Sequence, residues 1–162
     1  MSYKRLTDQS LLNQLEKFDI GKGQLSFEIL ETTLLDNTDN ATRVILESLT
    51  EMGIELELDD FGSGHASILA LLELKPDRFK IDRQLISNMH ESASQKALVR
   101  SIIDIGKSLD LEVIAEGIEC IEHAKMLEEM GCNMLQGYYF SKPISNEHFI
   151  EFVTQKKWLD AA

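Results

Sequence analysis

Two adjacent carboxylates, Asp59 and Asp60, stand where an apolar, strand-like run at residues 54–58 breaks into the glycine-rich sequence Phe-Gly-Ser-Gly at 61–64. Neighbouring negative charges repel each other, so a strand end that carries two of them is typical of a site that holds a cation. For an isolated pair the plainer interpretation is an aspartate that caps a helix or forms a turn beside glycine. The other polar residues at strand ends therefore decide between a cation site and a structural turn.

Four other short apolar runs carry a polar group near their carboxyl end. These groups are Glu28, Lys80, Glu116 and Gln136, at the ends of runs that begin at residues 25, 78, 113 and 134. In parallel α/β sheets, ligands bind at the carboxyl ends of the strands. Five polar strand tips therefore predict one site, built around metal.

The composition excludes several classes of protein. The chain has 162 residues and a net charge of −12, with no Lys/Arg stripe, which argues against a DNA or RNA polymer as partner. The longest aliphatic run, residues 68–72, is too short to span a bilayer, and no apolar signal sequence follows Met1. Cys120 and Cys132 lack metal-binding or redox spacing, so we expect inert thiols and a cytoplasmic protein without membrane insertion.

Strand-like and helix-like segments alternate along the whole chain. Helices are expected at about 7–18, 40–52, 67–74, 83–109 with an interruption near 91–94, 121–130, and from the cap Ser145 onward; strands are expected at about 25–28, 54–60, 77–82, 113–116 and 133–138. The leucine, isoleucine and valine stripes of these segments are expected to form the core. This alternation predicts an α/β fold of about five parallel strands, either an open doubly wound sheet or part of a closed barrel.

Polar residues at the end of every strand favour the mouth of a barrel over a single crevice. A closed (β/α)8 barrel, however, typically needs roughly 250 residues. We therefore predict a partial (β/α)8 TIM-type barrel, in which residues 1–162 form a single domain.

Five motifs occur in the order found in one known family. They are Phe-Glu-Ile-Leu-Glu at residues 27–31, Asp-Asp-Phe-Gly-Ser-Gly at 59–64, Phe-Lys-Ile-Asp at 79–82, Ile-Ala-Glu-Gly-Ile-Glu at 114–119 and Gln-Gly-Tyr-Tyr-Phe-Ser-Lys-Pro at 136–143. In this order and spacing they resemble EAL domains, the bacterial phosphodiesterases that hydrolyse cyclic di-GMP. The resemblance runs from about residue 7 to about residue 155 and covers the later part, about three-fifths, of such a domain.

The sequence also departs from the family pattern. The Glu-Ala-Leu motif and an asparagine, both metal ligands on earlier strands of the family, are absent, so we expect the chain to begin after both. His65-Ala66 stands where the family often has Tyr-Ser, and Cys120 stands where threonine is usual.

The resemblance implies a role for each matching residue. Glu28 and Asp59 resemble ligands of a first metal, and Asp59 would bridge to a second metal that Asp60 also holds. Lys80 resembles the lysine that orients the attacking water, and Glu116 resembles the general base. The remaining assignments are Glu31, which would stabilise the loop at 59–67; Glu119 and Gln136, which would line the site; and Tyr138 and Pro143, which are candidate substrate contacts, although packing is the plainer interpretation of the aromatic run at 138–140.

The chemistry of a phosphodiester calls for the same residue types. Its negative charge repels hydroxide, so an acidic protein can attack it only through cations. Two divalent ions about 3.5–4 Å apart can activate water and stabilise both reacting oxygens. Carboxylate oxygens suit Mg²⁺ or Mn²⁺, and no His/Cys cluster indicates zinc. His65, His90, His123 and His148 are scattered along the sequence and are interpreted as non-catalytic.

Two other functions are weighed against hydrolysis of cyclic di-GMP to pGpG. A receiver domain also uses an acidic pair and a lysine, but here Lys80 follows Asp60 by only 20 residues with no acceptor aspartate between them. A degenerate, non-catalytic EAL-like module that binds the nucleotide or a protein stays open as the alternative.

A partial barrel would expose two sheet edges and an apolar interior, which invite association. We therefore expect a homo-oligomer, or binding of the missing N-terminal part in trans. We expect little or no turnover by the chain alone.

Overall fold

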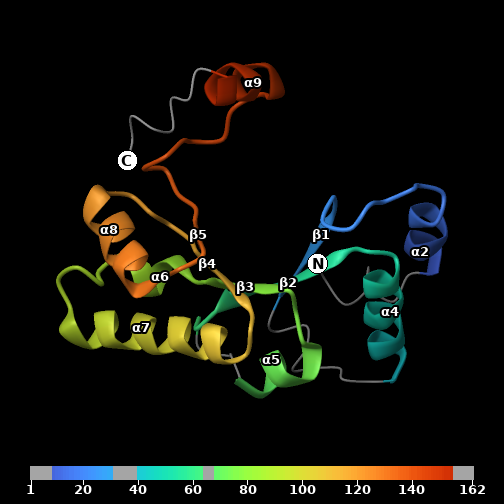
Figure 1. Ribbon diagram of the computed structural model, residues 1–162, viewed down its shortest axis with the longest axis horizontal. Coiled ribbons are helices and arrows are strands. Elements are labelled where there is room, and N and C mark those ends of the chain that lie inside the picture. The colour runs from blue at the N-terminus through green and yellow to red at the C-terminus, as the bar shows by residue number, and fades with distance from the viewer. Residues whose placement is uncertain (1–8, 31–39, 64–67, 155–162) are drawn as a thin grey trace. The chain divides into compact units, whose positions relative to one another are not determined.

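Twelve helices and strands alternate along the described part of the chain, residues 9–30, 40–63 and 68–154 of the computed structural model (Figure 1). They are α2 (Gln9–Leu15), β1 (Ser26–Leu30), α4 (Asn40–Glu51), β2 (Glu55–Phe61), α5 (Ile68–Leu74), β3 (Arg78–Ile81), α6 (Arg83–Ile86), α7 (Ala93–Ser108), β4 (Glu112–Ala115), α8 (Ile121–Met130), β5 (Met134–Leu135) and α9 (Asn146–Thr154). The chain divides into two compact units, Met1–Lys80 and Ile81–Ala162, called here the N-terminal and C-terminal units.

In the N-terminal unit, β1 and β2 pair in parallel. Their register runs from Ser26 opposite Glu55 to Leu30 opposite Asp59. The start of β3 is tied to β2 through Asp77, whose carboxylate accepts from Leu56 N at 2.9 Å and whose N–H donates to Leu56 O at 2.9 Å. This register brings the carboxyl ends of the strands to one edge, as the sequence predicted for its polar tips.

In the C-terminal unit, the last residue of β3 continues the ladder toward β4. Glu116 N donates to Ile81 O at 3.3 Å, and β4 pairs in parallel with β5 through Ile114 opposite Met134 and Ala115 opposite Leu135. The strand order β1-β2-β3-β4-β5 is the order along the chain, with a helix in each connection, as expected for repeated β-α-β units. The predicted α/β fold of five parallel strands is confirmed.

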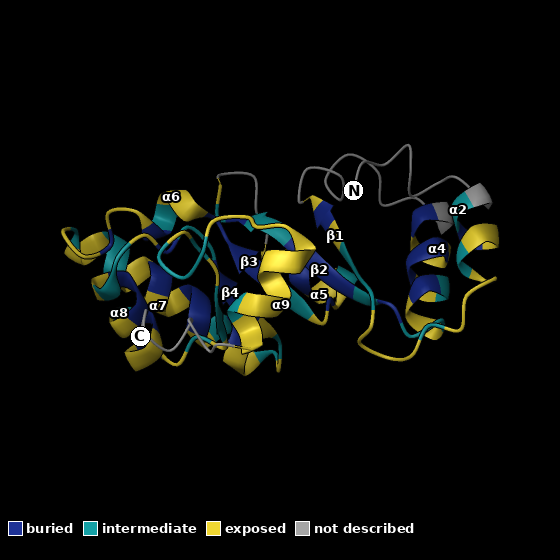
Figure 2. Cartoon of the chain, turned by 90° about the horizontal axis from the view of Figure 1, so that it is seen from above, coloured by how far each residue is buried: buried dark blue, intermediate teal, exposed yellow. Residues whose placement is uncertain are grey.

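The middle strands are buried on both faces, which is the usual state of parallel strands covered by helices. Leu58, Phe79, Ile81 and Val113 have no exposed surface, and Figure 2 shows the strands mostly as buried. Charged residues on such strands are accordingly costly unless they are paired. Lys80, at 5% exposure, therefore requires partners of opposite charge.

Two element boundaries differ from the sequence prediction. The helical region after β3 is interrupted over residues 87–92, wider than expected, because Ser92 caps a new helix by accepting from Gln95 N at 3.3 Å. The fifth strand was predicted over 133–138 but holds only Met134–Leu135. Beyond Leu135, Gln136 O and Tyr139 N bond to the backbone of Ile118 in the preceding connection, and Gly137 lies against that backbone.

Some apolar residues expected in the core are exposed. Val44 is 59% exposed on α4, whereas its neighbour Ile45 is buried, since adjacent helical residues point in different directions. On α9, Phe149 and Ile150 are 54% and 59% exposed, and the helix has no buried residue among those described (Figure 2). Among the described residues, no helix is long and apolar enough to cross a membrane.

Candidate functional site

Lys80 on β3 is the centre of an ion-pair cluster in the N-terminal unit. Its Nζ lies 2.8 Å from Glu28 Oε1 on β1 and 3.5 Å from Asp59 Oδ1 on β2. The lysine side chain is 7% exposed, while those of Asp59 and Glu28 are 18% and 52% exposed. Three residues that the sequence assigned to one site are thus brought together on three strands.

Strand alternation explains why these side chains meet. Phe79 and Ile81 are fully buried, and Lys80 between them projects to the opposite face of β3. That face carries charge along its length, because Arg78, two residues earlier, hydrogen-bonds Glu57 at 2.9 Å and Glu55 at 2.6 Å. Two layers of ion pairs therefore follow each other along β3.

In the Arg78 layer, one guanidinium lies between two glutamates. Burial alone would lower the pKa of Arg78, but the hydrogen bonds and charges of Glu57 and Glu55 raise it above its ordinary value. The guanidinium therefore stays charged and keeps the buried Glu57 paired. This layer supports the strands next to the site.

Asp60 has a backbone conformation that few side chains adopt. Its φ is +59°, in the left-handed region, and its N–H donates to Asp59 Oδ1 at 3.1 Å. Aspartate and asparagine tolerate this region better than other residues with a Cβ, because their short polar side chains can bond locally. The turn places two half-buried carboxylates one after the other at the end of β2.

The residues of the Lys80 cluster fit a hard divalent cation. Carboxylate oxygens of Glu28 and Asp59 both lie close to one positive group, the Lys80 ammonium. Oxygen donors of this kind suit Mg²⁺, Mn²⁺ or Ca²⁺. The chemistry of these donors therefore fits a hard divalent cation, and the assignment of Glu28, Asp59 and Asp60 as its ligands stays a prediction.

In the C-terminal unit, backbone hydrogen bonds join the segments that follow β4 and β5. Gln136 N donates to Ala115 O at 2.9 Å, Ile118 N donates to Gln136 O at 3.1 Å, and Tyr139 N donates to Ile118 O at 2.9 Å. Ile118 is fully buried, whereas Glu116 is half-buried. These bonds fix the backbone beside Glu116 and Gln136, as well as that of the exposed Glu119.

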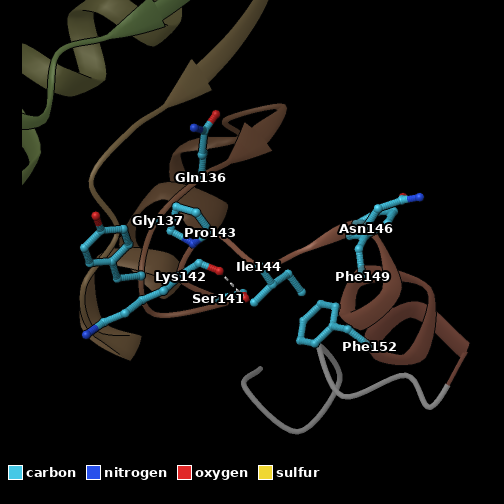
Figure 3. A pocket seen from close by; sticks show the side chains of 10 residues that line it. Gln136, Gly137, Ser141, Lys142, Pro143, Ile144, Asn146, Phe149 and Phe152 are labelled. Atoms are coloured by element: carbon cyan, nitrogen blue, oxygen red, sulfur yellow. Dashed lines mark hydrogen bonds between the residues drawn. The ribbon is translucent and has the colours of Figure 1, made fainter.

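Three predicted site residues line one hollow of about 590 Å³. Its lining is Gln136, Gly137, Tyr138, Ser141, Lys142, Pro143, Ile144, Asn146, Phe149 and Phe152. Figure 3 shows Gln136 and Pro143 on one side and Phe149 and Phe152 of α9 on the other. Tyr138 is 63% exposed and has Lys142 Nζ 5.8 Å from its ring centroid, so it has aromatic surface available to a ligand.

The structure adds two charged residues that the site prediction omitted. Arg78 forms the layer of ion pairs next to Lys80 along β3. Asp82, at 7% exposure, accepts from Gln84 N at 2.6 Å and caps α6. The cap was detectable in the sequence, because aspartate directly before a helix is a common N-cap. Predicted Glu31 lies outside the described residues.

The surroundings of Cys132 bear on the expectation that the thiols are inert. Cys132 Sγ donates to Val113 O at 3.3 Å and to Met134 O at 3.4 Å. Burial raises the pKa of its thiol above the ordinary value of 9.0. A protonated, hydrogen-bonded thiol is a poor nucleophile, which agrees with an inert role.

Comparison with known proteins identifies close relatives. Residues 1–143 match the family model described as the EAL domain. The chain is 37% identical over 142 residues to the signaling protein YkoW of Bacillus subtilis, covering 88% of this chain and 18% of YkoW. It is 35% identical over 144 residues to the bifunctional diguanylate cyclase/cyclic di-GMP phosphodiesterase MucR of Pseudomonas aeruginosa, covering 89% and 21%. The chain thus spans about a fifth of the length of these relatives.

Solved structures show the same fold. The MucR phosphodiesterase in complex with c-di-GMP superposes with a TM-score of 0.81 at 32% identity, covering 92% of this chain and 62% of that one. A manganese and c-di-GMP complex of Klebsiella pneumoniae BlrP1 gives a TM-score of 0.74 at 30% identity, covering 83% and 34%, and BlrP1 is also found with calcium. The predicted TIM-type fold is confirmed by these neighbours.

Proposed function

The chain belongs to the EAL domain family, and on that premise we propose that it supplies the metal-binding and water-activating residues of a phosphodiesterase that opens cyclic di-GMP to linear pGpG. The observation that carries the proposal is the cluster of Lys80 with Glu28 and Asp59, in which a buried ammonium and two carboxylates meet at the strand ends. Support also comes from MucR, which is described as a cyclic di-GMP phosphodiesterase.

We propose that Glu28, Asp59 and Asp60 hold Mg²⁺ or Mn²⁺, with Asp59 shared between two ions. Such ions would lower the pKa of water and neutralise charge on the phosphodiester. The hard carboxylate donors favour these ions over zinc. The left-handed backbone at Asp60 supports this assignment, because it departs from the regular alternation of side chains along β2 at the second of two successive carboxylates.

The other residues act on the water and the substrate in this proposal. Lys80, held by Glu28, orients the attacking water, and Glu116 takes its proton. Gln136 and Glu119 line the site, while Tyr138 and Pro143 contact the nucleotide. The hollow that Gln136, Tyr138 and Pro143 share supports this last role, because aromatic and apolar walls with a nearby lysine suit a base and its phosphate. Glu31 is proposed to stabilise the loop at 59–67.

Asp59→Asn is expected to abolish binding of Mg²⁺ and Mn²⁺ by the chain. The substitution removes the charge that would serve both ions, and asparagine preserves the size of the side chain. Calorimetric titration with Mn²⁺ measures the effect. Asp110→Asn is the matched control, because Asp110 is an exposed aspartate outside the residues assigned to the proposed site. Equal Mn²⁺ affinity in the Asp59→Asn variant and the unaltered chain would show that Asp59 is not a ligand.

Cyclic di-GMP is expected to bind the chain in the presence of Mn²⁺, and any product formed should be pGpG. Calorimetry with and without Mn²⁺ tests binding, and chromatography of the reaction tests turnover. Glu116→Gln should keep binding and lose turnover, since it cannot accept the proton. Because little or no turnover is expected of the chain alone, formation of any pGpG would exclude a non-catalytic module, and no response to nucleotide or metal would contradict the proposal. Sedimentation of the same samples tests the predicted self-association.

A further inference from the structure

Two histidines that are distant in sequence meet in the C-terminal unit. His123 Nε2, in the first turn of α8, lies 3.0 Å from His90 Nδ1, in the connection between α6 and α7. The ring centroids are 5.0 Å apart and the rings are inclined by 53°. The two histidines lie 33 residues apart, so nothing in the sequence grouped them, and their interpretation as non-catalytic stays a prediction.

The two imidazoles differ in their access to water. His123 is 3% exposed, and its Nδ1 has no hydrogen-bond partner among the described residues. The side chain of His90 is 34% exposed, and its Nε2 lies 3.6 Å from the carboxylate of Glu91. His123 on α8 is therefore shielded from water, whereas His90 on the connection is partly accessible to it.

The short distance limits how many protons the pair can hold. Each neutral imidazole carries one ring hydrogen, and a hydrogen bond at 3.0 Å needs one hydrogen between the facing nitrogens. One added proton is compatible with this bond, because His90 can donate through Nδ1 while its Nε2–H faces Glu91. A second added proton places hydrogens on both facing nitrogens, so that two like charges and two donors oppose each other.

We infer that His90 and His123 form an acid-sensitive clasp that ties the α6–α7 connection to α8, stays closed with one added proton and opens with two. The clasp joins the connection after α6, the helix that Asp82 caps, to α8, the helix that begins shortly after Glu119. Opening it would free both segments at once. The inference does not depend on the proposed hydrolysis of cyclic di-GMP.

The surrounding charges set which member of the pair resists protonation. Burial, and then the neighbouring His90, lower the pKa of His123 below its ordinary value of 6.5, while the nearby backbone of Ser87, and then Glu119 and Glu122, act in the opposite direction. Glu122 is ionised, because its own backbone N–H and the Cys120 thiol lower its pKa. Glu91 is the carboxylate that faces His90. Burial outweighs the acidic neighbours, so His123 is the imidazole that resists the second proton.

The sign of the pH dependence follows from this lowered pKa. The unfolded chain takes up a proton at His123 near pH 6.5, whereas the folded chain resists it until a lower pH. The stabilisation by the clasp is therefore complete above about pH 6.5 and is lost as the pH falls through the lower, folded value.

Comparison of His90→Ala with the unaltered chain tests the clasp. At about pH 7.5 the variant should unfold at a lower urea concentration than the unaltered chain, and at about pH 4.5 the two midpoints should coincide. Titration of the carboxylates that do not interact with His90 is common to both chains and cancels in the difference, which leaves the histidine pair together with Glu91 and Glu122. His148→Ala is the matched control, since His148 is an exposed histidine that makes one local bond to Ser145 Oγ, at 3.2 Å. His148→Ala should have the same urea midpoint as the unaltered chain at both pH values.

NMR titration of the histidine rings in the unaltered chain gives a second measurement that needs no variant. The His123 ring should change its protonation state below the ordinary histidine value, and only after the pair has taken up its first proton. A His123 titration at the ordinary value would overturn the inference. So would a difference between His90→Ala and the unaltered chain that is the same at both pH values, or one that His148→Ala reproduces.

Discussion

Replacing Lys80 with methionine is expected to tighten binding of Mg²⁺ or Mn²⁺ by at least about tenfold while lowering stability without metal by about 1–3 kcal/mol. The ammonium is the positive charge that Glu28 and Asp59 share, at 2.8 and 3.5 Å. Without it, the two carboxylates lose the positive charge that they share. A divalent cation then binds a more negative site. The electrostatic free energy that the folded chain lost with the ammonium adds to the binding free energy of the cation. Solvent around the half-exposed Glu28 limits the loss of stability.

Methionine keeps the length of the lysine stem, so the packing of β3 changes little. Calorimetry with Mn²⁺ and urea unfolding with and without metal measure the two effects. Lys125→Met, on the exposed face of α8, removes the same charge away from the site and should alter neither quantity. If the proposed function holds, Lys80→Met should also lose hydrolysis despite binding metal more tightly. Metal affinity that falls in Lys80→Met would contradict the shared-cation interpretation.

Periodicity and turn residues were enough to predict most of the fold. The helix ending at Met130 was predicted because glycine follows it, and Gly131 does adopt a left-handed φ of +74°. The Lys80 cluster was predicted because parallel strands bring their carboxyl ends together, so that spacing along the chain becomes proximity in space. These signals are local, or follow from topology alone.

What the sequence did not show depends on contacts between segments that have no common pattern. His90 and His123 lie 33 residues apart, and nothing near either one indicates the other. The short β5 is similar, because the residues that follow it bond to Ile118, a residue of the preceding connection. The exposed apolar face of α9 was also missed, since periodicity shows that a face exists but not whether it is covered.

Gly137→Ala is expected to destabilise the chain by more than about 3 kcal/mol. A methyl group on Gly137 would overlap the backbone O and N of Ile118, and backbone atoms cannot rotate away as a side chain can. Ile118 is itself held by its bonds with Gln136 and Tyr139, and it has no exposed surface. The new carbon must therefore break those bonds or displace the segment that carries Glu116. Urea unfolding measures the loss.

Gly131→Ala separates this steric effect from the general cost of replacing a glycine. Gly131 has a φ of +74°, where alanine costs about 1–2 kcal/mol, and its added methyl would meet Lys107 Nζ at 2.6 Å, the far end of a flexible side chain that donates to Met130 O. Conformational strain therefore acts at Gly131 and backbone overlap acts at Gly137. Overlap with fixed atoms is the larger effect, so Gly137→Ala should lower the unfolding midpoint at least about twofold more than Gly131→Ala. Equal losses would show that the segment around Ile118 yields readily and does not hold Glu116 and Gln136 in place.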